Sequence, residues 1–143
     1  MKLSGILSSK GHDVTTSAPH RTLREVVRIL TDQGIGAIVV TGADGEVLGI
    51  FSERDLVRAL GHHGTEVLDD AVSRHMTARV ITATEEMTVN DAMHRMTEGR
   101  FRHIPIVEHG RLCGLVSIGD VVKHRIAEIE QDRQAMLDYI GTA

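Results

Sequence analysis

The spacing of hydrophobic residues changes along the chain in a fixed order, and that order occurs twice. In its first occurrence, apolar side chains recur every three or four residues, as in a helix with one buried stripe, at Leu23, Val26, Val27 and Leu30. Two short apolar runs follow at residues 37–41 and 47–51, and the Asp44-Gly45 pair between them predicts a β-hairpin. A second helix is predicted from Ser52, with inward-facing side chains at Leu56, Val57 and Leu60.

The second occurrence repeats each of these elements. Its helical stripe consists of Val89, Ala92, Met93 and Met96, its apolar runs span residues 103–107 and 112–116, and its second helix follows Ser117 with Val121, Val122 and Ile126 facing inward. Thr22 matches Thr88 before the hairpin, and Asp55 matches Asp120 after it, because one residue is lost from the second turn. The chain is therefore predicted to be an internal duplication.

Each copy is predicted to fold as β-α-β-β-α. The first strand is a short extended stretch at residues 14–16 or 80–82, and the helix after it is capped by Thr22 with Glu25 or by Thr88 with Asp91. A unit of about 50 residues is too small to be stable alone. We therefore expect the two copies to pack sheet to sheet, with pseudo-two-fold symmetry, as one α+β domain.

Three segments are predicted along the chain. Residues 1–66 hold an N-terminal segment and the first repeat, residues 67–130 a connector and the second repeat, and residues 131–143 a helical tail. The polar stretch between the repeats, residues 62–76, has a short helical piece around residues 67–72. The tail has apolar residues roughly on one side and no counterpart in the first copy, so it either covers the module or docks against a second chain.

Composition narrows the function classes. The net charge of -4, with Lys and Arg scattered among acids, argues against nucleic-acid binding. No apolar run is long enough to span a membrane, so we expect a cytoplasmic protein without membrane contact. Cys113, the only cysteine, matches a strand position and is predicted to be a core thiol. The nine histidines show no ligand spacing, which predicts surface positions and no metal site.

The phrases GIFSERD and GLVSIGD, each followed by an apolar helix, together with the duplication, resemble the tandem form of the CBS domain. The stretch RFRHIPIVEHGRLCGLVSIGDVVK is especially similar to the second repeat of that family, and the resemblance covers residues 14–126. It implies a disc-like pair with a cleft between the copies, often assembled as a homodimer. It also implies binding of adenosine-containing ligands: AMP, ADP or ATP, and sometimes NAD or S-adenosylmethionine.

The resemblance assigns two sets of cleft residues. One cleft takes Ser117 and Asp120 with Thr16, Ala18, Ile35, Gly36 and Ala37. The other takes Ser52, Arg54 and Asp55 with Thr82, Thr84, Phe101, Arg102 and His103. The carboxylate would accept hydrogen bonds from ribose, and the serine with the first N–H groups of its helix would face phosphate.

The two clefts differ in charge, because Arg54 and Arg102 have glycines at the matching places of the other cleft. We therefore expect phosphate-rich ligands to prefer the Asp55 cleft. The Ser-x-x-Asp motif is also a helix cap, and both roles are compatible. The favoured function is a regulatory adenine-nucleotide sensor that signals to an unidentified protein partner. The alternative is a ligand-free interaction or dimerisation module, with clefts filled by side chains such as Phe101. No catalytic constellation is found, which argues against an enzyme.

Overall fold

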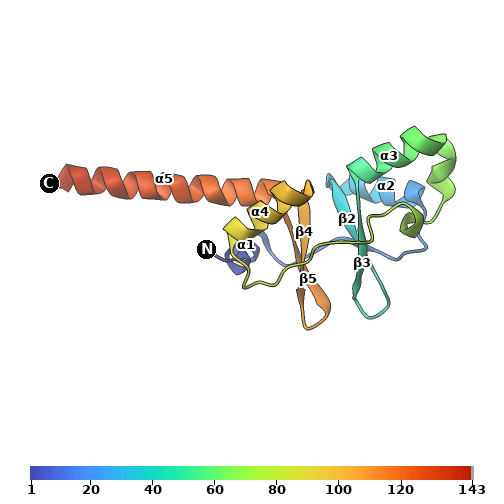
Figure 1. The fold of residues 1–143 in the computed structure, drawn as a ribbon, viewed down its shortest axis with the longest axis horizontal. Helices are drawn as coiled ribbons and strands as arrows, with labels where there is room; N and C mark the ends of the chain where they lie inside the picture. Colours follow the sequence, from blue (N-terminus) through green and yellow to red (C-terminus); the bar gives the residue numbers. More distant parts are fainter. Residues whose placement is uncertain (143) are drawn as a thin grey trace.

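The computed structural model describes residues 1–142, and Ala143, the last residue of the predicted tail, lies outside the described residues. The elements are α1 (Leu3–Lys10), β1 (Thr16–Ser17), α2 (Leu23–Gln33), β2 (Ala37–Thr41), β3 (Val47–Ser52), α3 (Glu53–His63), the 3-10 turns η1 (Gly64–Asp69) and η2 (Val72–Arg74), α4 (Val89–Gly99), β4 (His103–Glu108), β5 (Arg111–Ser117) and α5 (Ile118–Thr142). Figure 1 shows two hairpins side by side, with helices beyond each and α5 projecting from one end.

The first repeat has the predicted order of elements. Its sheet has the strand order β1-β2-β3, in which β1 runs parallel to β2 and β3 antiparallel to it. Successive residues of β2 point to opposite faces, so Ile38 and Val40 pack with Phe51 against the helices, while Ala37 and Val39 face the other sheet. The two 3-10 turns lie in the predicted connector and add Val67 and Val72 to the helix-side core.

The second repeat lacks the first strand that the sequence predicted at residues 80–82. Its sheet contains only β4 and β5, and the preceding segment makes one isolated parallel bridge, from Ala83 to Ile106. The N-terminal helix α1 covers this half instead, because Leu3, Ile6 and Leu7 belong to the core around β4, α4 and α5. The segment boundaries at residues 66 and 130 stay a prediction. We propose to keep them with one change, which is that α1 belongs to the second half of the molecule.

The two sheets pack against each other through a small apolar interface. Ala37, Val39 and Ile50 of the first repeat lie in one buried cluster with Leu112 and Leu115 of β5. This contact confirms the α+β class and the sheet-to-sheet arrangement of the two repeats. It also leaves the ends of the sheets, where α3 and α5 begin, as the rims of the space between the halves (Figure 1).

Local sequence signals explain where the helices begin. The Thr22 side chain accepts the backbone N–H of Glu25 at 3.2 Å, and Thr88 accepts that of Asp91 at 3.1 Å. Both caps are as predicted, because each oxygen satisfies a backbone donor that has no partner inside the helix. Helix α2 ends at Gly34 in a left-handed conformation that a glycine adopts without strain.

Three inward-facing positions were predicted wrongly. Val57 is 68% exposed, Val122 is 45% exposed and Ile126 is 56% exposed. Helix α3 instead buries Asp55 and Ala59, with Leu56 and Leu60 only half-buried beside them. Helical spacing shows that apolar residues share one face of a helix. It does not show which face the neighbouring sheet covers.

Candidate functional site

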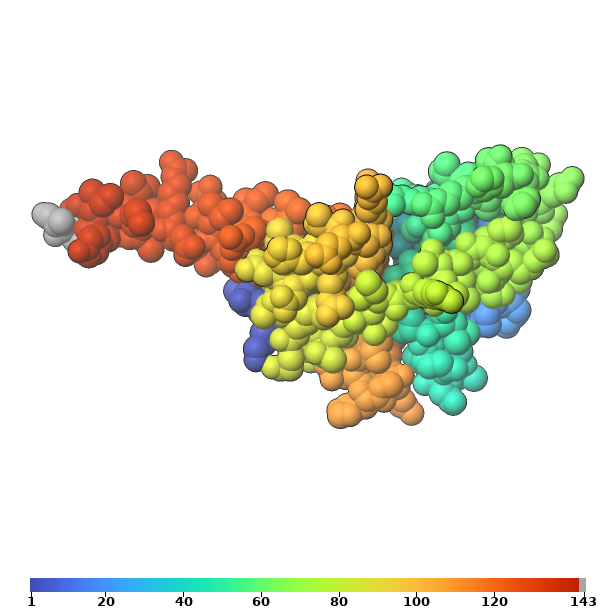
Figure 2. All heavy atoms as spheres, in the orientation of Figure 1, coloured from blue at the N-terminus to red at the C-terminus, as the bar shows by residue number. Residues whose placement is uncertain are grey.

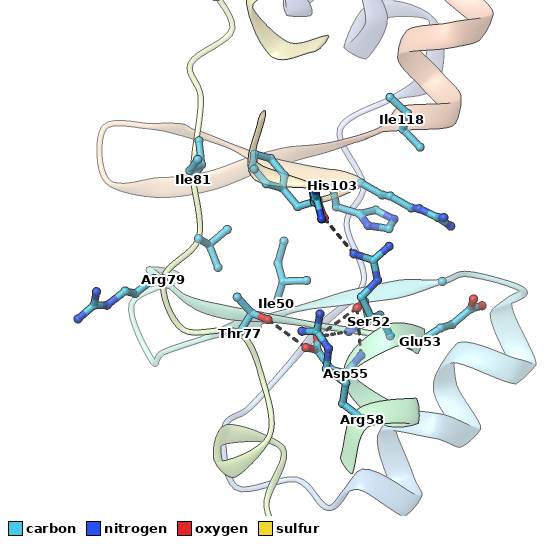
Figure 3. A pocket seen from close by; sticks show the side chains of 17 residues that line it. Ile50, Ser52, Glu53, Asp55, Arg58, Thr77, Arg79, Ile81, His103 and Ile118 are labelled. Carbon is cyan, nitrogen blue, oxygen red and sulfur yellow. Dashed lines mark hydrogen bonds between the residues drawn. The ribbon is translucent and has the colours of Figure 1, made fainter. Parts of the chain in front are cut away.

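A cavity of about 880 Å³ lies between the two repeats, and we call it the Asp55 cleft (Figure 3). Its lower wall in Figure 3 comes from β3 and the start of α3, and its upper wall from the α4–β4 connection and the start of α5. The chain that joins the repeats closes one side. The lining residues are Gly36, Ile50, Ser52, Glu53, Arg54, Asp55, Arg58, Thr77, Arg79, Val80, Ile81, Gly99, Arg100, Phe101, Arg102, His103 and Ile118.

Asp55 is a buried carboxylate at the first turn of α3. Its Oδ2 accepts the Ser52 backbone N–H at 2.9 Å and the Ser52 hydroxyl at 3.1 Å, and its Oδ1 accepts the Thr77 hydroxyl at 3.0 Å (Figure 3). Ser52 in turn caps the helix, so the two residues form a reciprocal capping box. A carboxylate has about four acceptor positions. Three are occupied, which leaves one on Oδ1 for a hydroxyl of a ligand.

The first N–H of each second helix already has a partner. The Glu53 N–H donates to the Gly36 carbonyl at 3.0 Å, and the Ile118 N–H donates to the Arg102 carbonyl at 2.8 Å. The expectation that the very first N–H groups face a phosphate is therefore wrong for these two. The residue just before each hairpin, Gly36 or Arg102, thus holds the start of the second helix in place.

Positive charge dominates the rim of the Asp55 cleft. Five arginines line it against two carboxylates, and the arginines are Arg54, Arg58, Arg79, Arg100 and Arg102. The Arg54 guanidinium donates to the Arg100 carbonyl at 2.9 Å and so spans the space between the repeats. Figure 3 shows Arg58 extending from α3 towards the cleft, whereas Arg79 points away from it. The cleft is suited to an anion held by α3 and the α4–β4 connection.

The remaining lining is apolar and shaped by one glycine. Its apolar members are Ile50, Val80, Ile81, Phe101 and Ile118. A Cβ added to Gly99 would overlap the Phe101 ring. The ring therefore packs onto the backbone of α4, and the cleft stays open instead of being filled by Phe101.

His103 lines the cleft as a neutral imidazole near pH 7. Burial lowers the pKa of His103, and the nearby charges of Lys10 and Arg102 lower it further, while Asp120 and Glu53 act in the opposite direction. The positive charge of the rim therefore comes from arginine. A bound anion would reverse part of this effect by favouring the imidazolium.

The equivalent carboxylate of the second repeat is already paired. Asp120 Oδ2 accepts the Ser117 backbone N–H at 2.8 Å, and the Lys10 ammonium lies 2.6 Å from the same oxygen. Lys10 also donates to the Leu115 carbonyl at 2.7 Å, so the last residue of α1 is fixed over this site. Although burial raises the pKa of Asp120, the hydrogen bonds from Lys10 and Ser117 lower it overall.

Comparison with protein families decides what these paired motifs are. The family model of the CBS domain matches the chain twice, over residues 2–62 and 71–127. The chain belongs to the CBS domain family. The duplication that the sequence indicated is thus a CBS pair, and the Asp55 cleft lies between its two members.

Several known CBS proteins resemble the whole chain. The mitochondrial CBS domain-containing protein CBSX3 of Arabidopsis thaliana is 34% identical over 146 residues, which cover 96% of this chain and 71% of that protein. A crystal structure of a CBS-domain-containing protein from Agrobacterium tumefaciens is 47% identical with a TM-score of 0.85, and the match covers 87% of this chain and 99% of that one. A CBS domain protein from Pyrobaculum aerophilum complexed with AMP is 27% identical with a TM-score of 0.75, over 84% of this chain and 89% of that one.

The structure gathers one of the two predicted sets of CBS cleft residues. Ser52, Arg54, Asp55, Phe101, Arg102 and His103 all line the Asp55 cleft. Thr82 and Thr84, predicted for the same set, are exposed and do not line it. Gly36, predicted for the other set, lines the Asp55 cleft as well.

The rest of the second set is scattered. Thr16 lines a different cavity of about 390 Å³, together with Thr41 and Arg111. Ser117 and Asp120 line neither of these two cavities. The other three members of the set are Ala18 and Ile35, which are half-buried, and Ala37, which is buried between the sheets.

Several residues at these sites were missed from the sequence, and four of them contribute to the charge or hydrogen bonding described above. Arg58 has a local signal, because it lies four residues after Arg54 on one face of α3. Thr77, Arg100 and Lys10 have none that identifies them, since Thr77 comes from the connector, Arg100 bonds Arg54 through its carbonyl, and Lys10 reaches Asp120 from the other end of the chain.

The histidines and the cysteine form no further site in the part of the chain that the structure describes. Within residues 1–142, no three His, Cys, Asp or Glu side chains gather as metal ligands. His75 Nε2 lies at hydrogen-bond distance, 2.7 Å, from the Asp70 carboxylate. Cys113 is half-buried against the core formed by α1, α4, β4 and α5. Burial, together with the charges of Glu85 and Glu108, raises the pKa of its thiol. No helix in residues 1–142 is long and apolar enough to cross a membrane.

Proposed function

We propose that this CBS pair is a regulatory module that binds a phosphorylated adenine nucleotide in the Asp55 cleft. The observation that carries the proposal is the combination of a buried ribose-type acceptor, Asp55, with a rim of arginines in one cavity. The AMP complex of the Pyrobaculum aerophilum relative supports the adenosine part. CBS pairs are in general regulatory rather than catalytic, which supports a sensing role.

The cleft suggests how the nucleotide lies. One ribose hydroxyl donates to the free acceptor position of Asp55 Oδ1, in a charge-assisted bond of about 1.5 to 3 kcal/mol. Phosphates extend along the start of α3 towards Arg58 and Arg102, where several donors meet one anion. The base lies between Ile50, Val80 and the other apolar lining residues. ADP and ATP satisfy more of the arginines than AMP, and S-adenosylmethionine, which has a net positive charge and a single carboxylate in place of phosphates, satisfies the fewest of these ligands.

The second cleft is the weaker site in this proposal. A ribose at Asp120 competes with the Lys10 ammonium, which already occupies the carboxylate at 2.6 Å. The inequality in ligand affinity that the arginines predict is therefore reinforced by Lys10, the last residue of α1.

Ligand binding has a direct route to a conformational change. Arg54 reaches across the cleft to the Arg100 carbonyl, so an anion that takes the guanidinium breaks a bond between the two repeats. The resulting preference for one arrangement of the halves is the differential affinity that regulation requires. We propose that a protein partner reads this arrangement in a cytoplasmic setting, with the CBS pair acting as a homodimer.

Calorimetry with ATP, ADP, AMP, adenosine and S-adenosylmethionine tests the proposal. ATP should bind tightest and S-adenosylmethionine weakest, and Arg58→Gln should weaken ATP about tenfold while leaving adenosine unchanged. Arg28→Gln, on the exposed face of α2, is the matched control. Absence of binding by every nucleotide would refute the proposal and favour the ligand-free interaction module.

A further inference from the structure

Helix α5 leaves the body of the molecule as a single helix. Its first turns pack against α1, α4 and β5, and the rest projects alone (Figure 2). The side that faces the body carries Val121, which is buried, and His124 and Glu128, which are half-buried. A projecting helix without tertiary packing is marginally stable in water, so its exposed surface is expected to have a use.

A second stripe on α5 is apolar and exposed. Its members follow alternating spacings of four and three residues, and they are Val122, Ile126, Ile129, Arg133, Met136 and Ile140. The five apolar side chains are between 45% and 65% exposed. This spacing is the a/d pattern of a coiled coil, with Arg133 as its one charged member. Because Val122 is rotated by about 100° from Val121, the body does not cover the stripe.

The charges beside the stripe change sign along the helix. Lys123 and Arg125 flank its first part, whereas Glu130 and Asp132 flank its second part, and all four are exposed. A helix with this arrangement is complementary to a copy of itself that runs in the opposite direction.

We propose that a second copy of this chain covers the stripe, with the two α5 helices antiparallel and Ile126 of each copy against Ile129 of the other. In this register, Lys123 and Arg125 of each copy meet Glu130 and Asp132 of its partner. Arg133 packs over Val122 of the partner copy, with its guanidinium able to reach solvent. Met136 lies over Gly119, which has no side chain to obstruct it.

The alternatives place like charges together. A parallel pair brings Arg133 against Arg133 at the centre of the interface. An antiparallel pair shifted by seven residues brings Glu130 against Glu130 and Asp132 against Asp132. Like charges opposite each other are destabilising, so they select the proposed register over both.

Charge reversal tests the pairing. The variants Lys123→Glu/Arg125→Glu and Glu130→Lys/Asp132→Lys should each weaken the dimer at least about tenfold, since four ion pairs of about twofold each turn repulsive. An equimolar mixture should restore the wild-type dissociation constant in sedimentation equilibrium at physiological salt. Arg28→Glu/Asp32→Lys on the exposed face of α2 is the control. A monomeric wild type, or a dimer that ignores both variants, would overturn the proposal.

Cysteine cross-linking tests the direction. In a Cys113→Ser background, Ile126→Cys mixed with Ile129→Cys should form a disulfide-linked dimer, and neither variant alone should do so. Rapid cross-linking of Ile126→Cys with itself would show a parallel pair. Cross-linking of Ile126→Cys with Met136→Cys instead of with Ile129→Cys would show the shifted register. Either result contradicts the proposal. The tests use no nucleotide, so their outcome is independent of the Asp55 cleft.

Discussion

Replacing Lys10 with methionine isolates the contact that occupies the second cleft. The methionine keeps an aliphatic stem on the last turn of α1 and removes only the ammonium group. In the wild type that group lies 2.6 Å from Asp120 Oδ2 and 2.7 Å from the Leu115 carbonyl. Its loss leaves the carboxylate with the Ser117 donors alone.

The size of the effect follows from the partial burial of the pair. The Lys10 and Asp120 side chains are 35% and 24% exposed, so solvent screens them only in part. We expect a loss of about 1 to 2 kcal/mol in the free energy of unfolding. For a chain of this size, the midpoint of thermal unfolding would fall by about 3 to 7 °C.

The stabilisation by the Lys10–Asp120 pair depends on pH. The pKa of Asp120 is lowered in the folded protein, so its pairing stabilises the fold above the ordinary carboxyl pKa of 3.8 and is lost as the pH falls through the lowered value. The difference in the free energy of unfolding between wild type and Lys10→Met should therefore be largest near neutral pH, and only the contribution of the Leu115 hydrogen bond should remain once Asp120 is protonated.

Urea denaturation at neutral and acidic pH measures this difference. Lys2→Met is the matched control, because Lys2, the N-cap residue of α1, also pairs with a carboxylate, that of Glu86, but these two side chains are 55% and 73% exposed. Lys10→Met should also reveal a second nucleotide-binding event in calorimetry. Equal stability losses for the two lysine variants, or a Lys10 effect that is undiminished in acid, would refute the reasoning.

Three further predictions concern the Asp55 cleft. Thr77→Val removes a donor to the buried Asp55 carboxylate and should reduce the free energy of unfolding by about 1 to 2 kcal/mol. Adenosine binding should be kept or tightened, and the control Thr77→Ser should change neither quantity. Weaker adenosine binding in the valine variant alone would contradict Asp55 as the ribose acceptor. Gly99→Ala should push the Phe101 ring into the cleft and weaken ATP in calorimetry, whereas Gly61→Ala, which meets nothing within 4 Å, should not; equal ATP affinities would refute the packing argument. Burial is the main cause that lowers the pKa of His103, so the contribution of His103 to stability is present above pH 6.5 and is lost as the pH falls further. The affinity for ATP should rise as the pH falls over the same range. A His103 resonance in NMR that titrates in the same way with and without ATP would contradict this prediction.

The sequence predicted those features that depend on neighbouring residues. The Thr22 and Thr88 caps and both hairpins are found as expected, because a side-chain cap or a tight turn is determined within four or five residues. The duplication was visible for the same reason, since each copy repeats these local signals.

The features that were missed depend on distant parts of the chain. Residues 80–82 were expected to add a strand, but α1 supplies much of the packing of the second half, and only one bridge forms there. Val57 was assigned to the core because its spacing is helical, yet the sheet covers the adjacent stripe with Asp55 and Ala59. Nothing in the spacing of either motif indicates that Lys10 pairs with Asp120.

The position of Lys10 also bears on how easily a ligand could reach Asp120 in the proposed second cleft. Leu3 and Leu7 anchor α1 in the second core, whereas Lys10 lies in the last turn, just before Gly11 at a φ of 100°. The Gly11 N–H bonds the Leu7 carbonyl at 2.7 Å, so unwinding this turn breaks few backbone bonds and leaves the buried leucines in place. Fraying at a helix end costs far less than global unfolding. We therefore predict that a ligand at Asp120 would compete with one ion pair and one helical turn, not with the core, so that the proposed second site would be weakened in this chain without being removed.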